Sequence, residues 1–236
     1  MRTFAFVFAR GGSKGLPGKN IRPLLGKPLL CYAVDLAIQL NDIEHVFVST
    51  EDEEIATIAR AAGAVVIPRP VELATDTSAE FLSWQHAVAW AEQHYGQFER
   101  FVSLPATAPL RHASDVQSAM SRLQQTRADI CVSMTPAHRS PYFNMVRQLS
   151  DGLVQIAIPA DDALCRRQDA PVLFDLTTVV YVTTPAYIRQ SPGVLAGKVT
   201  AITVPKNRAI DIDDIDDFIV AEALLAHALT EKEKPC

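Results

Sequence analysis

The stretch Ala9-Arg-Gly-Gly-Ser-Lys-Gly-Leu-Pro-Gly-Lys-Asn20 combines glycines with three cations and connects two apolar segments. The apolar run that leads into it, residues 4–9, predicts a buried first strand. The segment after it, residues 28–38, predicts a helix with Pro28 in its first turn. Glycines let a backbone turn tightly and present its N–H groups at close range. Such a loop at the carboxyl end of a first strand predicts an open α/β sheet with a polyphosphate site on the loop.

The spacing excludes two better-known phosphate motifs. A Walker loop needs Gly, four residues and then Gly-Lys-Ser/Thr. Here Asn20 follows Lys19, and Ser13 stands where the leading glycine belongs. The dinucleotide fingerprint Gly-x-Gly-x-x-Gly does not occur in the chain. The remaining alternative is a surface loop without a ligand.

Composition and length limit the class of protein. At 236 residues, with 48% hydrophobic and 21% charged residues, the chain suits a single α/β domain over residues 1–236. The net charge of −5 argues against nucleic acid as a partner, because nucleic-acid binding favours a basic surface. No run of about 18 apolar residues occurs, so we expect no membrane partner. The four cysteines are scattered without a C-x-x-C pair, which predicts reduced thiols and a cytoplasmic location.

Apolar runs and helical periodicities alternate along the chain. Predicted strands cover residues 4–9, 45–49, 64–67, 101–104, 130–134, 177–182 and 199–204. Predicted helices cover residues 28–38, 52–62, 78–95, 114–125 and 214–229, with Ser78 as the expected cap of the third helix. This alternation predicts a mostly parallel, doubly wound (Rossmann-like) sheet with helices on both faces.

The alternation is interrupted after Pro136. Residues 145–149 and 153–158 flank the pair Asp151-Gly152, which is typical of a tight turn between antiparallel strands. We therefore expect a small β-hairpin inside an insertion at about residues 138–170, because a hairpin does not continue the strand–helix alternation.

An arginine follows the third predicted strand, in the segment Arg69-Pro-Val-Glu-Leu-Ala-Thr-Asp-Thr77. The two prolines favour an extended loop that directs Arg69 toward the carboxyl edge of the sheet. The guanidinium donors fit O2 and N3 of a pyrimidine base. A salt-bridged loop without a ligand explains the same residues equally well.

Two carboxylates precede the last predicted helix, in Asp211-Ile-Asp213. Residues i and i+2 of an extended backbone point to one face, so the two carboxylates would repel unless a cation lies between them. Mg²⁺ favours one or two carboxylates together with phosphate oxygens. The alternative is an acidic helix start, which the helix dipole stabilises.

These segments resemble the acylneuraminate (sialic acid) cytidylyltransferases, which activate acidic nine-carbon sugars with CTP. The similarity is strongest in the loop Ala9–Asn20 and extends to Arg69–Thr77, Leu104–Arg111, Arg166–Phe174 and Ile210–Asp213. The related Kdo cytidylyltransferases carry Ser-Thr-Arg before Leu-Pro-Gly-Lys and resemble the chain less. The resemblance implies one nucleotidyltransferase domain and a homodimer, in which the insertion reaches toward the partner's site.

The resemblance also implies roles for individual residues. Nucleotide binding is expected at Arg10, Gly11, Gly12, Ser13, Lys19, Asn20, Arg69 and Thr107, with cytosine at Arg69. Sugar binding is expected at Arg111, Arg167 and Gln168, since a guanidinium is a strong partner for a sugar carboxylate. Catalysis is expected to involve Arg10, Lys19 and Asp211, and Mg²⁺ is expected at Asp211 and Asp213.

Two departures from the family pattern fall on the sugar side. Pro105 stands where the family usually has a glutamine that contacts the sugar, and Thr177-Thr178 stands where it usually has Asn-Gly.

The expected reaction joins CTP to an acidic 2-keto-3-deoxy sugar, a sialic acid or a related nonulosonic acid, and releases pyrophosphate. The alternatives are the same reaction on a Kdo-type eight-carbon sugar and a nucleotide-binding module without turnover. The absent fingerprint disfavours an NAD-dependent dehydrogenase.

Overall fold

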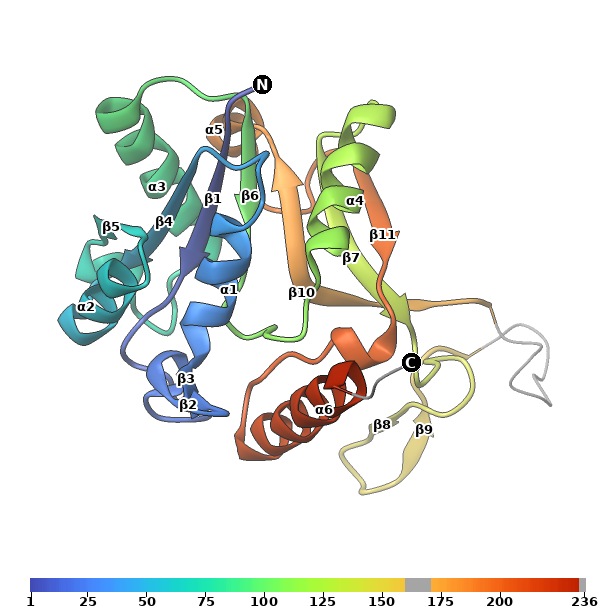
Figure 1. The fold of residues 1–236 in the computed structure, drawn as a ribbon. Coiled ribbons are helices and arrows are strands. Elements are labelled where there is room, and N and C mark those ends of the chain that lie inside the picture. The colour runs from blue at the N-terminus through green and yellow to red at the C-terminus, as the bar shows by residue number, and fades with distance from the viewer. Residues whose placement is uncertain (160–170, 234–236) are drawn as a thin grey trace.

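The computed structural model describes residues 1–159 and 171–233, and its centre is a seven-stranded sheet in the order β11-β7-β10-β6-β1-β4-β5 (Figure 1). The strands are β1 (Thr3–Phe8), β4 (His45–Thr50), β5 (Val65–Pro68), β6 (Arg100–Ser103), β7 (Ile130–Pro136), β10 (Phe174–Thr183) and β11 (Val199–Thr203). Neighbouring strands are parallel except for β10, which is antiparallel to both β6 and β7. The predicted mostly parallel α/β sheet is therefore confirmed.

Helices cover both faces of this sheet. Buried residues of α1 (Leu29–Ile38), α2 (Glu53–Ala61) and α4 (Ala113–Gln125) form one core with Ala5 and Val7 of β1. On the opposite face, α3 (Glu80–Tyr95) and α5 (Pro185–Gln190) pack with Phe4 and Phe6 of the same strand. This division follows from the two-residue period of a strand, which sends successive side chains to opposite faces.

A local sequence signal explains the start of α2, whereas the signals predicted for the starts of α3 and α1 do not act as expected. Asp52 caps α2 as its side chain accepts hydrogen bonds from the N–H groups of Glu54 (2.9 Å) and Ile55 (3.0 Å). Ser78 does not cap α3, because this helix begins at Glu80 with Ala79 at the cap position. Pro28 likewise precedes α1 instead of forming its first turn, since it has extended backbone angles and pairs with Pro23.

The C-terminal helix α6 (Ile215–Glu233) packs against the N-terminal segment of the chain. Its Phe218 and Ala221 share a third apolar core with Leu16 of the glycine-rich loop and Leu24 of β2 (Pro23–Leu24). Figure 1 shows α6 beyond one end of the sheet, close to the short hairpin of β2 and β3 (Lys27–Pro28). The glycine-rich loop and the β2–β3 hairpin therefore meet the C-terminal helix beyond one end of the sheet.

The predicted hairpin is confirmed as a separate two-stranded sheet. Strand β8 (Val146–Gln148) pairs antiparallel with β9 (Val154–Ile156), and Gly152 between them has a φ of 87°. The limits that we predict for the insertion stay a prediction, because residues 160–170 lie outside the described ranges. Within those ranges, none of the helices combines the length and apolar character that crossing a bilayer requires.

The turn between β2 and β3 contains a residue in an unfavourable backbone conformation. Leu25 has a φ of 47° and is followed by Gly26 with a φ of 81°. Two-residue turns with positive φ at both positions favour Asn-Gly, because a leucine at the first position crowds its Cβ against the backbone. We predict that Leu25→Asn stabilises the protein by roughly 1 kcal/mol, as measured by urea unfolding.

The matched control is Leu25→Ala, which removes the exposed side chain but keeps the unfavourable Cβ. The alanine variant should gain little stability. An asparagine variant that is no more stable than the alanine variant would contradict the assignment of strain to this position.

Candidate active site

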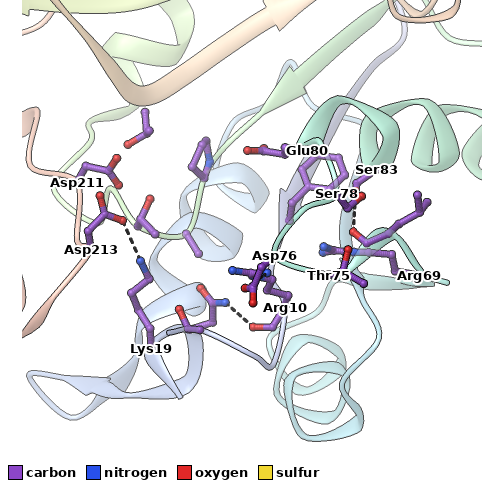
Figure 2. Close-up of a pocket in the computed structure, with 18 of the residues that line it drawn as sticks. Arg10, Lys19, Arg69, Thr75, Asp76, Ser78, Glu80, Ser83, Asp211 and Asp213 are labelled. Atoms are coloured by element: carbon purple, nitrogen blue, oxygen red, sulfur yellow. Dashed lines mark hydrogen bonds and ion pairs between the residues drawn. The ribbon is translucent and has the colours of Figure 1, made fainter. Parts of the chain in front are cut away.

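A cavity of about 380 Å³ opens at the edge of the sheet where the glycine-rich loop meets the segment before α6 (Figure 2). Its walls come from the loop after β1, the loop between β5 and α3, the loop after β6, strand β10 and the acidic segment. Eight residues predicted for the site line this cavity: Arg10, Ser13, Lys19, Asn20, Arg69, Thr107, Asp211 and Asp213. These predicted residues meet at one edge of the sheet because parallel strands bring the loops at their carboxyl ends together.

The glycine-rich loop and the acidic segment are joined directly through Lys19. The buried Lys19 ammonium lies 3.2 Å from Oδ1 of Asp213 and donates a hydrogen bond to the carbonyl of Ile212. The Ile212 N–H in turn donates to the carbonyl of Thr107 at 2.9 Å. These contacts place the cationic loop and both predicted metal carboxylates on one cavity.

The other two cations of the loop are paired with a carboxylate from the β5–α3 loop. Asp76 lies 2.9 Å from Nη1 of Arg10 and also binds Nζ of Lys14. These bonds, led by the one from Lys14, hold the pKa of the Asp76 carboxyl below its usual value. The sequence contained Asp76 in the Arg69–Thr77 segment, but nothing in the pattern indicated that it would neutralise the glycine-rich loop.

Two backbone groups of the loop form hydrogen bonds with side chains, one from outside the loop and one from its last residue. The Gly11 N–H donates to Oε1 of Glu51 at 2.8 Å, and the Asn20 side-chain amide donates to the Arg10 carbonyl at 3.0 Å. Neither Gly11 nor Gly12 lines the cavity. Their assignment to nucleotide binding therefore stays a prediction, whereas Asn20 both lines the cavity and fixes the backbone of Arg10.

Arg69 is buried at the wall of the cavity that lies opposite Asp211 and Asp213 in Figure 2. Its Nη2 donates to the Ala9 carbonyl at 3.2 Å and its Nε to the Ser49 hydroxyl at 3.3 Å. Burial lowers the pKa of this guanidinium. The hydrogen bonds fix the arginine between the ends of β1 and β4, and its contact with a base stays a prediction.

Three acidic groups share the region of the cavity between Arg69 and the acidic segment. Burial raises the pKa of Asp211, while the Thr107 hydroxyl opposes this shift. Burial also raises the pKa of Glu80. The pKa of Tyr181 is raised to about 12, because its side chain is buried and the charges of Glu80 and Asp211 lie nearby. Neither Glu80 nor Tyr181 is predicted from the sequence as a site residue, although Glu80 follows closely on the Arg69–Thr77 segment.

Strand β10 is irregular where it borders the cavity. Its pairing with β7 shifts between Thr177 and Val182, and Thr178 lines the cavity inside this irregular stretch. The Ser133 hydroxyl of β7 accepts a hydrogen bond from the Val180 N–H at 3.1 Å and lies 3.0 Å from the Thr177 carbonyl. Ser133 therefore satisfies backbone groups that the interrupted ladder leaves unpaired.

A family model described as Cytidylyltransferase matches residues 4–189 of the chain. The chain belongs to this family. A cytidylyltransferase relative from Campylobacter jejuni, CMP-N,N'-diacetyllegionaminic acid synthase, is 30% identical over 222 residues, which are 93% of each chain. The N-acylneuraminate cytidylyltransferase of Streptococcus agalactiae is 29% identical over 99% of this chain, which spans 56% of that longer relative.

A solved structure supports the fold of this cytidylyltransferase. The structure is described as CMP:2-keto-3-deoxy-manno-octonic acid synthetase complexed with CTP. It matches with a TM-score of 0.71 and 15% identity over 97% of this chain and 100% of that one. At this identity the likeness concerns the fold of the cytidylyltransferase and not its substrate.

Of the predicted sugar-binding residues, Arg111 lies in the described part of the chain, and it does not line the cavity. Arg111 is buried, and its Nε donates to the Val179 carbonyl at 2.7 Å while Nη2 donates to the Pro105 carbonyl. Burial lowers the pKa of Arg111 to about 9. The guanidinium thus joins the loop after β6 to strand β10, and its contact with a sugar stays a prediction. Arg167 and Gln168 lie outside the described residues.

A glycine is required at position 15 of this cytidylyltransferase, because the glycine-rich loop and the acidic segment approach each other closely there. A Cβ at Gly15 would collide with the carbonyl oxygen of Asp213, whereas a Cβ at Gly12 would meet no atom within 4 Å. We predict that Gly15→Ala lowers the free energy of unfolding by about 1–3 kcal/mol, as overpacking typically does. Chemical denaturation measures this loss.

Gly12→Ala is the matched control from the same loop and should change stability little. Equal losses of stability in the two variants would contradict the close approach of Gly15 to the acidic segment.

Proposed function

We propose that the protein transfers the CMP group of CTP to an acidic 2-keto-3-deoxy sugar of the nonulosonic acid class, with release of pyrophosphate. The observation that carries this proposal is the Lys19–Asp213 pair, which holds a cationic phosphate loop and two carboxylates on one cavity. The names of the Campylobacter and Streptococcus relatives support the reaction class.

In the proposed complex the triphosphate lies on the glycine-rich loop, where Arg10, Ser13, Lys19 and Asn20 line the cavity. Arg69 faces the cytosine from the opposite wall. The anomeric hydroxyl of the sugar attacks the α-phosphorus, the bond to the β-phosphate breaks, and pyrophosphate leaves with the electron pair. Arg10 and Lys19 stabilise the charge that develops on the phosphates, and electrostatic stabilisation of this kind supplies most of the rate in phosphoryl transfer.

Asp211 takes up the proton of the sugar hydroxyl in this proposal. Its carboxylate lines the same cavity as the glycine-rich loop that is proposed to hold the triphosphate. The Thr107 hydroxyl hydrogen-bonds to this carboxylate and keeps it oriented. Asp211 therefore holds a proton acceptor in a fixed position at the cavity wall.

Magnesium is the cofactor that we propose for this site. Among the described residues no group of three or more histidine, cysteine or acidic side chains is arranged to hold a metal ion. Asp211 and Asp213 supply two carboxylates at the cavity, and this set fits Mg²⁺, which completes its coordination with phosphate oxygens and water. When bound, Mg²⁺ would neutralise part of the triphosphate charge.

The sugar side of the cavity differs from the family pattern at two wall residues. Pro105 lines the cavity with a side chain that offers no hydrogen bond, and Thr178 lines it with a hydroxyl. The relatives with legionaminic and acylneuraminic acid in their names are 30% and 29% identical to this chain.

A panel of nonulosonic acids and Kdo, each tested with CTP for pyrophosphate release, would identify the acceptor. No release with any sugar would favour a binding module.

Lys19 provides the most direct test of the mechanism. We predict that Lys19→Ala lowers the rate of pyrophosphate release by about 10²–10³-fold, because a positioned charge on the reacting phosphates is lost. Lys14→Ala removes a highly exposed lysine from the same loop and should have a much smaller effect. Circular dichroism would establish that both variants are folded. Full activity of a folded Lys19→Ala variant would exclude the mechanism.

The magnesium assignment predicts a dependence on both the metal and Asp213. Chelation with EDTA should stop pyrophosphate release and added Mg²⁺ should restore it. Asp213→Asn should raise the Mg²⁺ concentration that gives half-maximal activity by at least about tenfold. Asp216→Asn removes the same charge from the first turn of α6 and should leave that concentration unchanged.

We also propose that the protein is a homodimer and acts in the cytoplasm. Exposed apolar side chains gather on the β8–β9 hairpin, among them Val146 and Val154, and such patches mark protein interfaces. The free, buried thiols of Cys31 and Cys131 support a reducing location.

Sedimentation equilibrium should give the mass of two chains, and Val154→Glu should shift the protein toward one chain, because it introduces a charge on the apolar hairpin. Leu195→Glu adds the same charge at an exposed leucine outside the hairpin and should leave the dimer intact. A wild-type protein that sediments as one chain would contradict the proposal.

A further inference from the structure

Glu80 places a carboxylate at the cavity in addition to those of Asp76, Asp211 and Asp213. It is the first residue of α3, lines the cavity, and has no part in the mechanism proposed above. The Trp84 indole N–H donates to its Oε1 at 3.1 Å, one helical turn away, and so fixes the side chain. Glu80 keeps its accessible surface because it faces the cavity (Figure 2).

The neighbours of Glu80 define what kind of ligand group it can meet. Its carboxylate is close enough to Arg69 and Asp211 for both charges to affect its pKa, and burial is the largest cause of its raised pKa. A carboxylate in this position repels phosphates and the carboxylate of an acidic sugar. The part of a bound substrate that lies at Glu80 must therefore donate hydrogen bonds.

Cytosine offers such a group beside the atoms that suit Arg69. The pairing edge of the base carries two acceptors, O2 and N3, and next to N3 the two N–H donors of the 4-amino group. Guanidinium donors fit the acceptors, and a carboxylate accepts from the amino group. The Ser78 hydroxyl lines the same side of the cavity and has no hydrogen-bond partner among the described residues.

We propose that Glu80 selects cytosine over uracil by accepting a hydrogen bond from the 4-amino group while Arg69 donates to the neighbouring acceptors of the ring. The inference rests on the proposed use of CTP and names the residue that selects CTP over UTP. Uracil carries a carbonyl oxygen at position 4, whose lone pairs would face the carboxylate and repel it. Glu80 is thus a specificity-determining residue that lies between Arg69 and the acidic segment.

The test compares binding of CTP and UTP by calorimetry, with Mg²⁺ present and sugar absent, for wild type, Glu80→Gln and Glu72→Gln. Wild type should prefer CTP by on the order of tenfold to a hundredfold. Glu80→Gln should bring the two affinities close together, because an amide can accept from the amino group or donate to the carbonyl. Glu72→Gln removes a carboxylate that does not line the cavity and should keep the preference.

A second measurement uses only the wild-type protein, so that it holds even where Glu80→Gln fails to fold. The CTP analogue that lacks the 4-amino group should bind more weakly than CTP by a similar factor. An unchanged CTP preference in folded Glu80→Gln, or equal wild-type affinity for CTP and the analogue, would overturn the inference and leave Glu80 as the partner of Trp84. Failure of wild type to bind either nucleotide would instead overturn the proposed function.

Discussion

The contact of Lys19 with the segment Ile212–Asp213 is the interaction on which the site depends. One ammonium group holds a backbone carbonyl and a carboxylate from the opposite end of the chain. It can do so because α6 packs on the apolar side chains of the N-terminal segment and because Gly15 lets the two backbones touch. Without this contact the cations and the carboxylates would belong to separate surfaces.

The charges around the cavity are separated in a way that suits a substrate with distinct ends. Arg10 and Lys19 of the glycine-rich loop line one part of the cavity, where Asp76 pairs with Arg10. Carboxylates of Asp211 and Glu80 lie in surroundings that raise their pKa values, mainly through burial.

The sequence predicted the elements of the sheet and the meeting of its loops, because both follow from periodicity and from parallel strand order. It did not predict the direction of β10, since an apolar run carries no information on which way a strand points. The sequence also did not predict the hydrogen bonds of Arg69 to the carbonyls of Ala9 and Ser49, because these depend on three-dimensional side-chain geometry. Ser78 resembled a helix cap in sequence, but the helix begins two residues later, and within residues 1–159 and 171–233 the Ser78 hydroxyl has no hydrogen-bond partner.

The interrupted ladder of β10 has a consequence for how new substrate ranges can evolve on this scaffold. Between Thr177 and Val182 the strand is held by the Ser133 hydroxyl and not by regular pairing with β7. Val179 and Val180 of this stretch are fully buried in the core, whereas Thr178 is only half-buried and lines the cavity. Thr178 is therefore the position of the irregular stretch at which a new side chain would change the cavity wall without changing the core of the sheet.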